Sequence, residues 1–284
     1  MLINKIEHHK LYTQIKNELS KKKITIIFIE GIITGLLSLI SYGILARYMS
    51  LEDYGEYNSS IGVLCIFTLI CSLGLPQIAT KLYSNDASSS ENNKSLIRGF
   101  NKFAPYAVII LTLTIFTLLL LVQIFINRAS IIEIENFSAI LILLPIVCLN
   151  NFLVACCSAN GKGLESNLIS GWGTQILSIL VIVLSIFLTG KSLDVLQVAI
   201  LHGIVLITQL IFLLKLQKRS APSFFKKGTK NFQIISWLKE GIPFSLIAFG
   251  TSYFFSAGVI IMGLIFHNTK EAAVLGLAAN FAAV

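Results

Sequence analysis

Charged side chains are scarce in this sequence. Asp, Glu, Lys and Arg make up 13% of its 284 residues, and hydrophobic residues make up 55%. Soluble globular domains carry about 25% charged residues. So few charges do not cover the surface of a soluble domain of this length. The composition therefore excludes that class and predicts an all-α polytopic membrane protein.

Acidic residues are the rarer charge, with 14 Asp and Glu against 22 Lys and Arg and a net charge of +8. A positive balance can indicate nucleic-acid binding. Here, however, the basic residues cluster in the loops between apolar runs, where they act as topology signals. We therefore expect no nucleic-acid partner.

The sequence also lacks cysteine pairs at metal or redox spacing. All five cysteines lie inside apolar runs, and none forms a C-x-x-C pair; they are Cys65, Cys71, Cys148, Cys156 and Cys157. Isolated cysteines in apolar segments are typical of small packing residues. We expect no disulfide framework, no metal site and no cofactor.

Seven apolar runs are long enough to cross the ~30 Å hydrocarbon core as helices, and an eighth begins near Ala272. The seven runs cover residues 24–46, 59–80, 103–126, 137–158, 168–188, 195–214 and 241–266. Most Lys and Arg residues lie in alternate loops, while the loops on the other side hold only Arg47, Arg128, Lys191 and Lys270. The positive-inside rule then places the N-terminus in the cytoplasm.

The first apolar run has a polar edge. On a helical wheel, its small and polar residues share one arc; they are Glu30, Gly31, Thr34, Gly35, Ser38, Ser41 and Tyr42. We expect this edge to face protein or water, since lipid gives no reason to collect polar residues on one side. Glu30 is a candidate site for a coupling proton or sodium ion, with a protonated structural carboxyl as the alternative. Gly31 and Gly35 predict close helix packing.

The turn after this run carries a recognisable pattern. Residues 45–57, LARYMSLEDYGEY, resemble the LAR-x-L-x-x-x-x-Y-G-x-Y turn of polysaccharide flippases. These are Wzx-like members of the exporter superfamily that also contains multidrug/toxin extruders and lipid II flippases. The likeness continues in residues 73–76, LGLP, followed by Lys81 where the family usually has a basic residue. Residues 241–244, GIPF, and 274–279, VLGLAA, resemble the start of that family's second half.

The resemblance implies two six-helix lobes related as a parallel repeat. It divides this chain into a basic amphipathic cytoplasmic segment at 1–23, a six-helix lobe at 24–216, a basic cytoplasmic linker at 217–240 and the start of a second lobe at 241–284. Family members have twelve or more spans. We therefore expect the chain to lack the C-terminal part.

The function that the resemblance implies is that of a flippase in the bacterial plasma (inner) membrane, and not of an enzyme. It would move polyprenyl-pyrophosphate-linked oligosaccharide units from the cytoplasmic to the outer leaflet, for O-antigen or capsule assembly. Its partners would be the lipid-linked oligosaccharide, membrane lipid, and a polysaccharide polymerase with its chain-length machinery.

Such a substrate needs a hydrated path, because one unpaired hydroxyl in hydrocarbon costs about 2–7 kcal/mol and a lone charge costs far more. Polar residues in the spans and cations at their ends are therefore candidate substrate contacts. They are Arg47, Gln77, Lys81, Arg98, Asn150, Asn151, Gln175 and Tyr253. For Arg47, an ion pair with Glu52 or Asp53 is the alternative.

Three other functions stay open. One is a cation-coupled exporter of the multidrug branch, and another is a truncated, non-functional remnant. The third is a membrane enzyme, which the short external loops disfavour because they hold no cluster of acid/base or nucleophilic groups.

Overall fold

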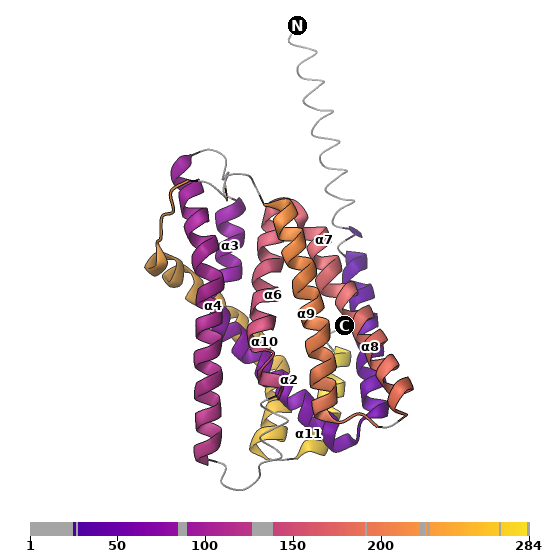
Figure 1. The fold of residues 1–284 in the computed structure, drawn as a ribbon. Helices are drawn as coiled ribbons and strands as arrows, with labels where there is room; N and C mark the ends of the chain where they lie inside the picture. The colour runs from indigo at the N-terminus through magenta and orange to yellow at the C-terminus, as the bar shows by residue number, and fades with distance from the viewer. Residues whose placement is uncertain are drawn as a thin grey trace.

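Helices make up almost all of the chain that the structure describes (Figure 1). The computed structural model describes residues 25–26, 28–84, 90–126, 139–190, 192–221, 225, 228–266 and 268–282. The segment predicted at 1–23 lies outside these ranges. The β-structure within them is one isolated parallel bridge between Met49 and Leu193. The predicted all-α class is confirmed for this part of the chain.

The helices follow one another with short connections. The first helix is Phe28–Tyr48. The others are α2 (Leu51–Ser72), α3 (Leu75–Ser84), α4 (Glu91–Ile126), α6 (Leu144–Cys157), α7 (Gly163–Leu168), α8 (Thr174–Thr189), α9 (Val195–Ser220), α10 (Ile234–Ile260) and α11 (Thr269–Ala282). Three single π-helical turns join some of them: η1 (Ser158–Lys162), η2 (Ile169–Gly173) and η4 (Ile261–Ile265).

Four helical stretches are long and apolar enough to cross a membrane, or five if the bent pair α2 and α3 counts as one span. The four are Phe28–Tyr48, Glu91–Leu118, Ala139–Leu188 and Val195–Ser220. The third has 50 residues, about 75 Å of helix and too long for one crossing. It turns back at Gly161, whose φ of 79° breaks the helix between α6 and α7 (Figure 1). α10 covers most of the seventh predicted run and α11 the start of the eighth, but neither is among these candidates.

Successive connections lie at opposite ends of the bundle (Figure 1). We call the end where α3 stops and α4 begins the Lys81 end, and the opposite end, where the first helix stops, the Arg47 end. α4 has 36 residues, about 54 Å of helix, which exceeds the ~30 Å hydrocarbon core. Its charged first turns, from Glu91 to Lys102, therefore lie outside the membrane at the Lys81 end.

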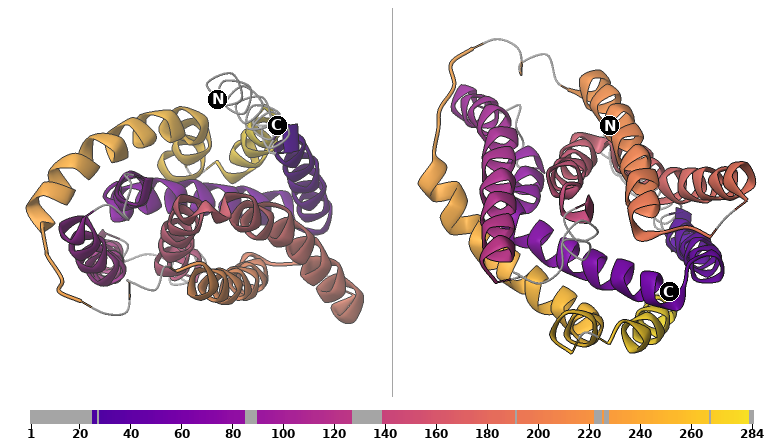
Figure 2. Two further views of the ribbon diagram at one scale, coloured as in Figure 1. Left: turned by 90° about the horizontal axis from the view of Figure 1, so that it is seen from above. Right: turned by 60° about the horizontal axis from the view of Figure 1, so that its bottom comes forward.

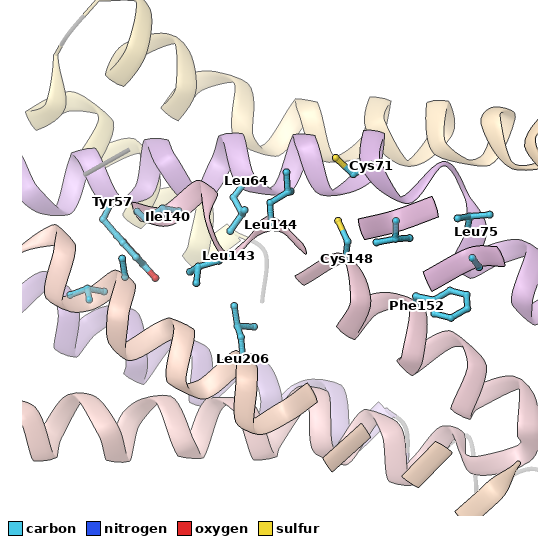
Figure 3. Close-up of a cluster of buried hydrophobic side chains, with 14 of the residues drawn as sticks. Tyr57, Leu64, Cys71, Leu75, Ile140, Leu143, Leu144, Cys148, Phe152 and Leu206 are labelled. Atoms are coloured by element: carbon cyan, nitrogen blue, oxygen red, sulfur yellow. The ribbon is translucent and has the colours of Figure 1, made fainter. Parts of the chain in front are cut away.

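α2 lies at the centre of the bundle. Seen along the bundle, α10 and α11 cover one side of it, while α6 and α9 lie on the other (Figure 2, left). Figure 3 shows side chains of α2, α3, α6 and α9 meeting in a buried core that includes Tyr57, Leu64, Leu75, Leu144, Phe152 and Leu206. The five cysteines are free and four of them are buried, consistent with the packing role predicted from the sequence.

Small residues bring α2 into close contact with η4 and α11. An added Cβ at Gly55 would overlap the Thr269 carbonyl, and one at Gly263 would overlap the Ser59 side chain. Small residues allow such close approach of helix backbones, and the helices then gain van der Waals contact. The close packing predicted at Gly31 is wrong, because an added Cβ there meets no atom within 4 Å.

Candidate functional site

A polar cavity of about 60 Å³ lies between the first helix, α2, α8 and α9. Its polar lining comes from all four helices and includes Ser41, Tyr42, Tyr57, Gln175, Ser178 and His202. Ligand pockets usually measure about 300–1,000 Å³, so in this conformation the cavity has room for water molecules but not for a sugar. Gln175 is the candidate from the sequence that the structure places here.

A tyrosine and a histidine meet in this cavity. Tyr57 Oη lies 3.4 Å from His202 Nδ1, and Tyr57 is buried. Sequence reasoning did not select either residue as a site residue. A signal was present, since Tyr57 is the last residue of the 45–57 pattern and Ser41 and Tyr42 lie on the polar edge of the first helix.

The Glu30 edge of the first helix faces protein, as predicted. Glu30 is 5% exposed, whereas Ile32 and Leu36, on the opposite face, are about half exposed. The neighbour of Glu30 is η2: Trp172 Nε1 donates a hydrogen bond of 3.0 Å to the Glu30 carbonyl oxygen, and an added Cβ on Gly171 would lie 3.7 Å from Glu30 Oε1.

One carboxylate oxygen of Glu30 is left over. Oε2 is buried and has no hydrogen-bond partner among the described residues. An ionised carboxylate left unpaired in such a place is costly, so a proton or a cation is needed to neutralise it. The ion-coupling role of Glu30 stays a prediction.

Lys81 forms an ion pair that crosses between distant parts of the chain. Its Nζ lies 2.6 Å from Glu240 Oε2, which joins α3 to α10 at the Lys81 end. Gln77 is exposed one turn earlier on α3. These two candidates from the sequence therefore lie on one face.

Arg98 is buried and fastened to the segment that precedes α10. Its Nε donates a hydrogen bond of 2.7 Å to the Thr229 carbonyl oxygen, and its Nη2 lies 2.5 Å from Glu91 Oε1. The Asn231 backbone N–H donates to the Ser95 carbonyl at 3.0 Å. The hydrogen bond from Arg98 lowers the pKa of the Glu91 carboxyl below its usual value of 4.5. We call residues 228–233 together with these contacts the linker strap.

The two asparagines on α6 point in different directions. Asn150 is buried, and its Nδ2 donates to the Leu206 carbonyl of α9 at 3.1 Å. Asn151 is exposed. The structure therefore does not bring them together in one site, as their adjacent positions on a helix require.

Arg47 is exposed beside a shallow groove that Tyr48 and Ile186 also line. The alternative predicted for it, an ion pair with Glu52 or Asp53, is wrong. Glu52 instead pairs with Lys270 at 3.2 Å, and Asp53 accepts a hydrogen bond of 2.6 Å from Ser50 Oγ.

The remaining candidate, Tyr253, lies on α10, but its side chain is not among those that the structure describes. Within the described ranges, no three His, Cys, Asp or Glu side chains gather as a metal-binding group. The candidates therefore fall into a cavity between four helices and a charged surface at the Lys81 end.

A family model described as polysaccharide biosynthesis protein matches residues 20–284. Neither the curated proteins nor the solved structures include a significant match to this chain.

Proposed function

Because the chain belongs to the polysaccharide biosynthesis protein family, whose model matches residues 20–284, we propose that it is a flippase for polyprenyl-pyrophosphate-linked oligosaccharides. It is a multi-pass membrane protein, with four or five candidate spans in the described ranges. The proposed direction is from the cytoplasmic to the outer leaflet of the bacterial plasma membrane, for surface polysaccharide such as O-antigen or capsule.

One observation supports this proposal above the others: the apolar helices turn polar faces toward each other. Glu30 and Ser41 are buried on the inner face of the first helix, while Ile32, Leu36 and Ile40 are about half exposed. A bundle of this kind keeps hydroxyl, amide and carboxyl groups away from lipid. Sugars need such groups, because hydroxyls cross bare hydrocarbon only at a cost of about 2–7 kcal/mol each.

The cavity is too small for a sugar, so transport requires the helices to separate. The proposed opening lies between α2 and the pair α10 and α11, which belong to the two proposed lobes at 24–216 and 241–284. The helices touch there through small residues such as Gly55 and Gly263. Contacts between small residues leave little side chain to reorganise, which suits a surface that opens and closes repeatedly.

Charge and direction agree in this proposal. The Lys81 end is proposed to face the cytoplasm, where the inside-negative potential favours outward movement of an anion by about 2.3 kcal/mol per charge per 100 mV. The polyprenyl tail stays in the bilayer, and a polymerase with its chain-length machinery takes the product.

The buried Glu30 carboxylate favours a second candidate, a cation-coupled exporter of small amphiphiles. Its unpaired Oε2 is suited to a proton or sodium ion. Saturable, sodium-driven dye efflux without an effect on surface glycan would support this second function.

Complementation tests the first proposal. The chain, and a version extended past Val284, are expressed in a flippase-deficient bacterium that is scored for surface polysaccharide. We expect polysaccharide to be restored by at least one form. If the cells make both forms and insert them in the membrane but no polysaccharide appears, the flippase assignment is wrong.

A further inference from the structure

The ion pair between Lys81 and Glu240 is exposed although it joins two helices. The pair has an N–O distance of 2.6 Å, and 56% of the Lys81 side chain and 43% of the Glu240 side chain are exposed. Exposed ion pairs contribute only about 0.2–1 kcal/mol. A more highly charged anion that reaches Lys81 can therefore displace the Glu240 carboxylate.

The surroundings of Lys81 suit an anion that carries sugars. Gln77 and Thr80 are exposed four residues and one residue before Lys81 on α3, and residues at such spacing share a helix face. They offer an amide and a hydroxyl beside the ammonium group. Lys239, next to Glu240, is also exposed and adds a second cation.

Arg98 differs from Lys81 in this respect. Only 2% of its side chain is exposed, and its guanidinium already holds the Thr229 carbonyl and Glu91. Gly228 packs its backbone against the same guanidinium, because an added Cβ there would overlap it. Displacing these partners would disrupt the linker strap, whereas displacing Glu240 would leave it in place.

The contact next to Glu240 is the part of α10 that would respond. An added Cβ at Gly241 would overlap the Leu73 carbonyl, and one at Gly74 would overlap the Gly241 carbonyl. The two backbones touch at the residue that follows Glu240. Loss of the ion pair therefore removes a restraint directly beside the contact between α10 and the turn that joins α2 to α3.

We propose that Glu240 occupies, in the empty protein, the place at Lys81 that the pyrophosphate of the lipid-linked substrate takes. Exchange of the carboxylate for the pyrophosphate releases the start of α10 and so couples substrate arrival to separation of α10 from α2. This inference rests on the proposed flippase function.

Binding of polyprenyl pyrophosphate, without sugar, to the full chain in lipid nanodiscs tests the exchange. The Kd is measured for the unmodified chain, Glu240→Gln, Lys81→Gln and the double variant. Glu240→Gln should tighten binding about 1.5- to 5-fold, which is the fold-change equivalent to an exposed ion pair. Lys81→Gln should weaken binding, and Glu240→Gln should have no effect in the Lys81→Gln background.

Glu165→Gln is the matched control, since it also removes one negative charge. Glu165 forms an exposed ion pair of 2.7 Å with Lys162, with 44% of each side chain exposed. The Kd of this variant should equal that of the unmodified chain. Equal tightening by Glu165→Gln would reduce the effect to net charge, and unchanged or weaker binding by Glu240→Gln would overturn the exchange.

Surface polysaccharide separates this inference from the proposed function. If the unmodified chain restores polysaccharide but Glu240→Gln does not tighten binding, only the exchange is wrong. If the unmodified chain neither binds polyprenyl pyrophosphate nor restores polysaccharide, both are wrong.

Discussion

Replacing Gly241 with alanine should push α10 away from the turn between α2 and α3. The added Cβ would overlap the Leu73 carbonyl oxygen and lie 3.1 Å from Ile78 Cδ1. A backbone carbonyl does not rotate away as a flexible side chain does. The two elements must therefore separate by about 1 Å, and overpacking of this kind costs about 1–3 kcal/mol.

Gly250→Ala, in the same helix, is the matched control. An added Cβ at Gly250 meets no atom within 4 Å, so this change only gains the helix propensity of alanine, up to about 1 kcal/mol. Gly241→Ala gains the same propensity but also creates the overlap. The difference between the two variants is therefore the cost of the overlap, about 1–3 kcal/mol, which equals a 5- to 150-fold shift in a two-state equilibrium.

Trp237 reports on this movement. It is 3% exposed, lies one turn before Gly241, and packs against Phe100 with ring centroids 5.3 Å apart. The chain has two tryptophans, so a Trp172→Phe background leaves Trp237 as the sole tryptophan. Iodide quenching in nanodiscs should rise in Gly241→Ala and stay unchanged in Gly250→Ala. Equal quenching in the two variants would refute the close contact.

Three further predictions concern the strap, the buried carboxyl and the cavity. Arg98→Ala removes charge-assisted hydrogen bonds worth about 1.5–3 kcal/mol each, so limited proteolysis should cut residues 228–233 faster, whereas Lys94→Ala, which loses only a 3.8 Å contact to Glu91, should behave as the unmodified chain; equal rates in all three would contradict the strap. Because the pKa of Glu91 is lowered in the folded chain, its contribution to the protection should be present at neutral pH and be lost as the pH falls through that lowered value; protection that does not change with acid would argue against the pair. Glu30→Gln should preserve membrane insertion but abolish the dependence of transport on a proton or sodium gradient, and a gradient dependence that persists would remove Glu30 from coupling. Tyr57→Phe should lower the thermal stability by about 0.5–1.5 kcal/mol if its hydroxyl bonds the neighbouring histidine, and an unchanged melting temperature would show that it does not.

Hydropathy located the helices because the signal is local in the sequence, but it missed where they begin. α2 begins at Leu51, eight residues before the predicted run, because the Ser50 side chain accepts from the Asp53 N–H and caps the helix. α4 begins at Glu91, well before the run predicted from 103. In both cases a polar helical segment precedes the apolar part, and hydropathy detects only the apolar part.

The polar edge of the first helix was predictable because helical periodicity fixes which residues share a face. The partners of that edge were not. Glu30 meets Trp172, and Lys81 meets Glu240, across more than 140 residues in each case. Such pairings depend on how the helices pack, which a single sequence does not encode in any local pattern. Close packing predicted at Gly31 failed for the same reason, since that glycine turns away from its neighbours.

The most direct test of the account measures transport of the lipid-linked sugar itself. The chain is reconstituted into sealed vesicles with a pyrophosphate-linked oligosaccharide in both leaflets, and a membrane-impermeant glycosidase is added outside. If polar helix faces shelter the sugar during the crossing, the enzyme should digest nearly all of the oligosaccharide, whereas vesicles without the protein should lose only the outer half. Digestion that stops at half in both kinds of vesicle would contradict the account.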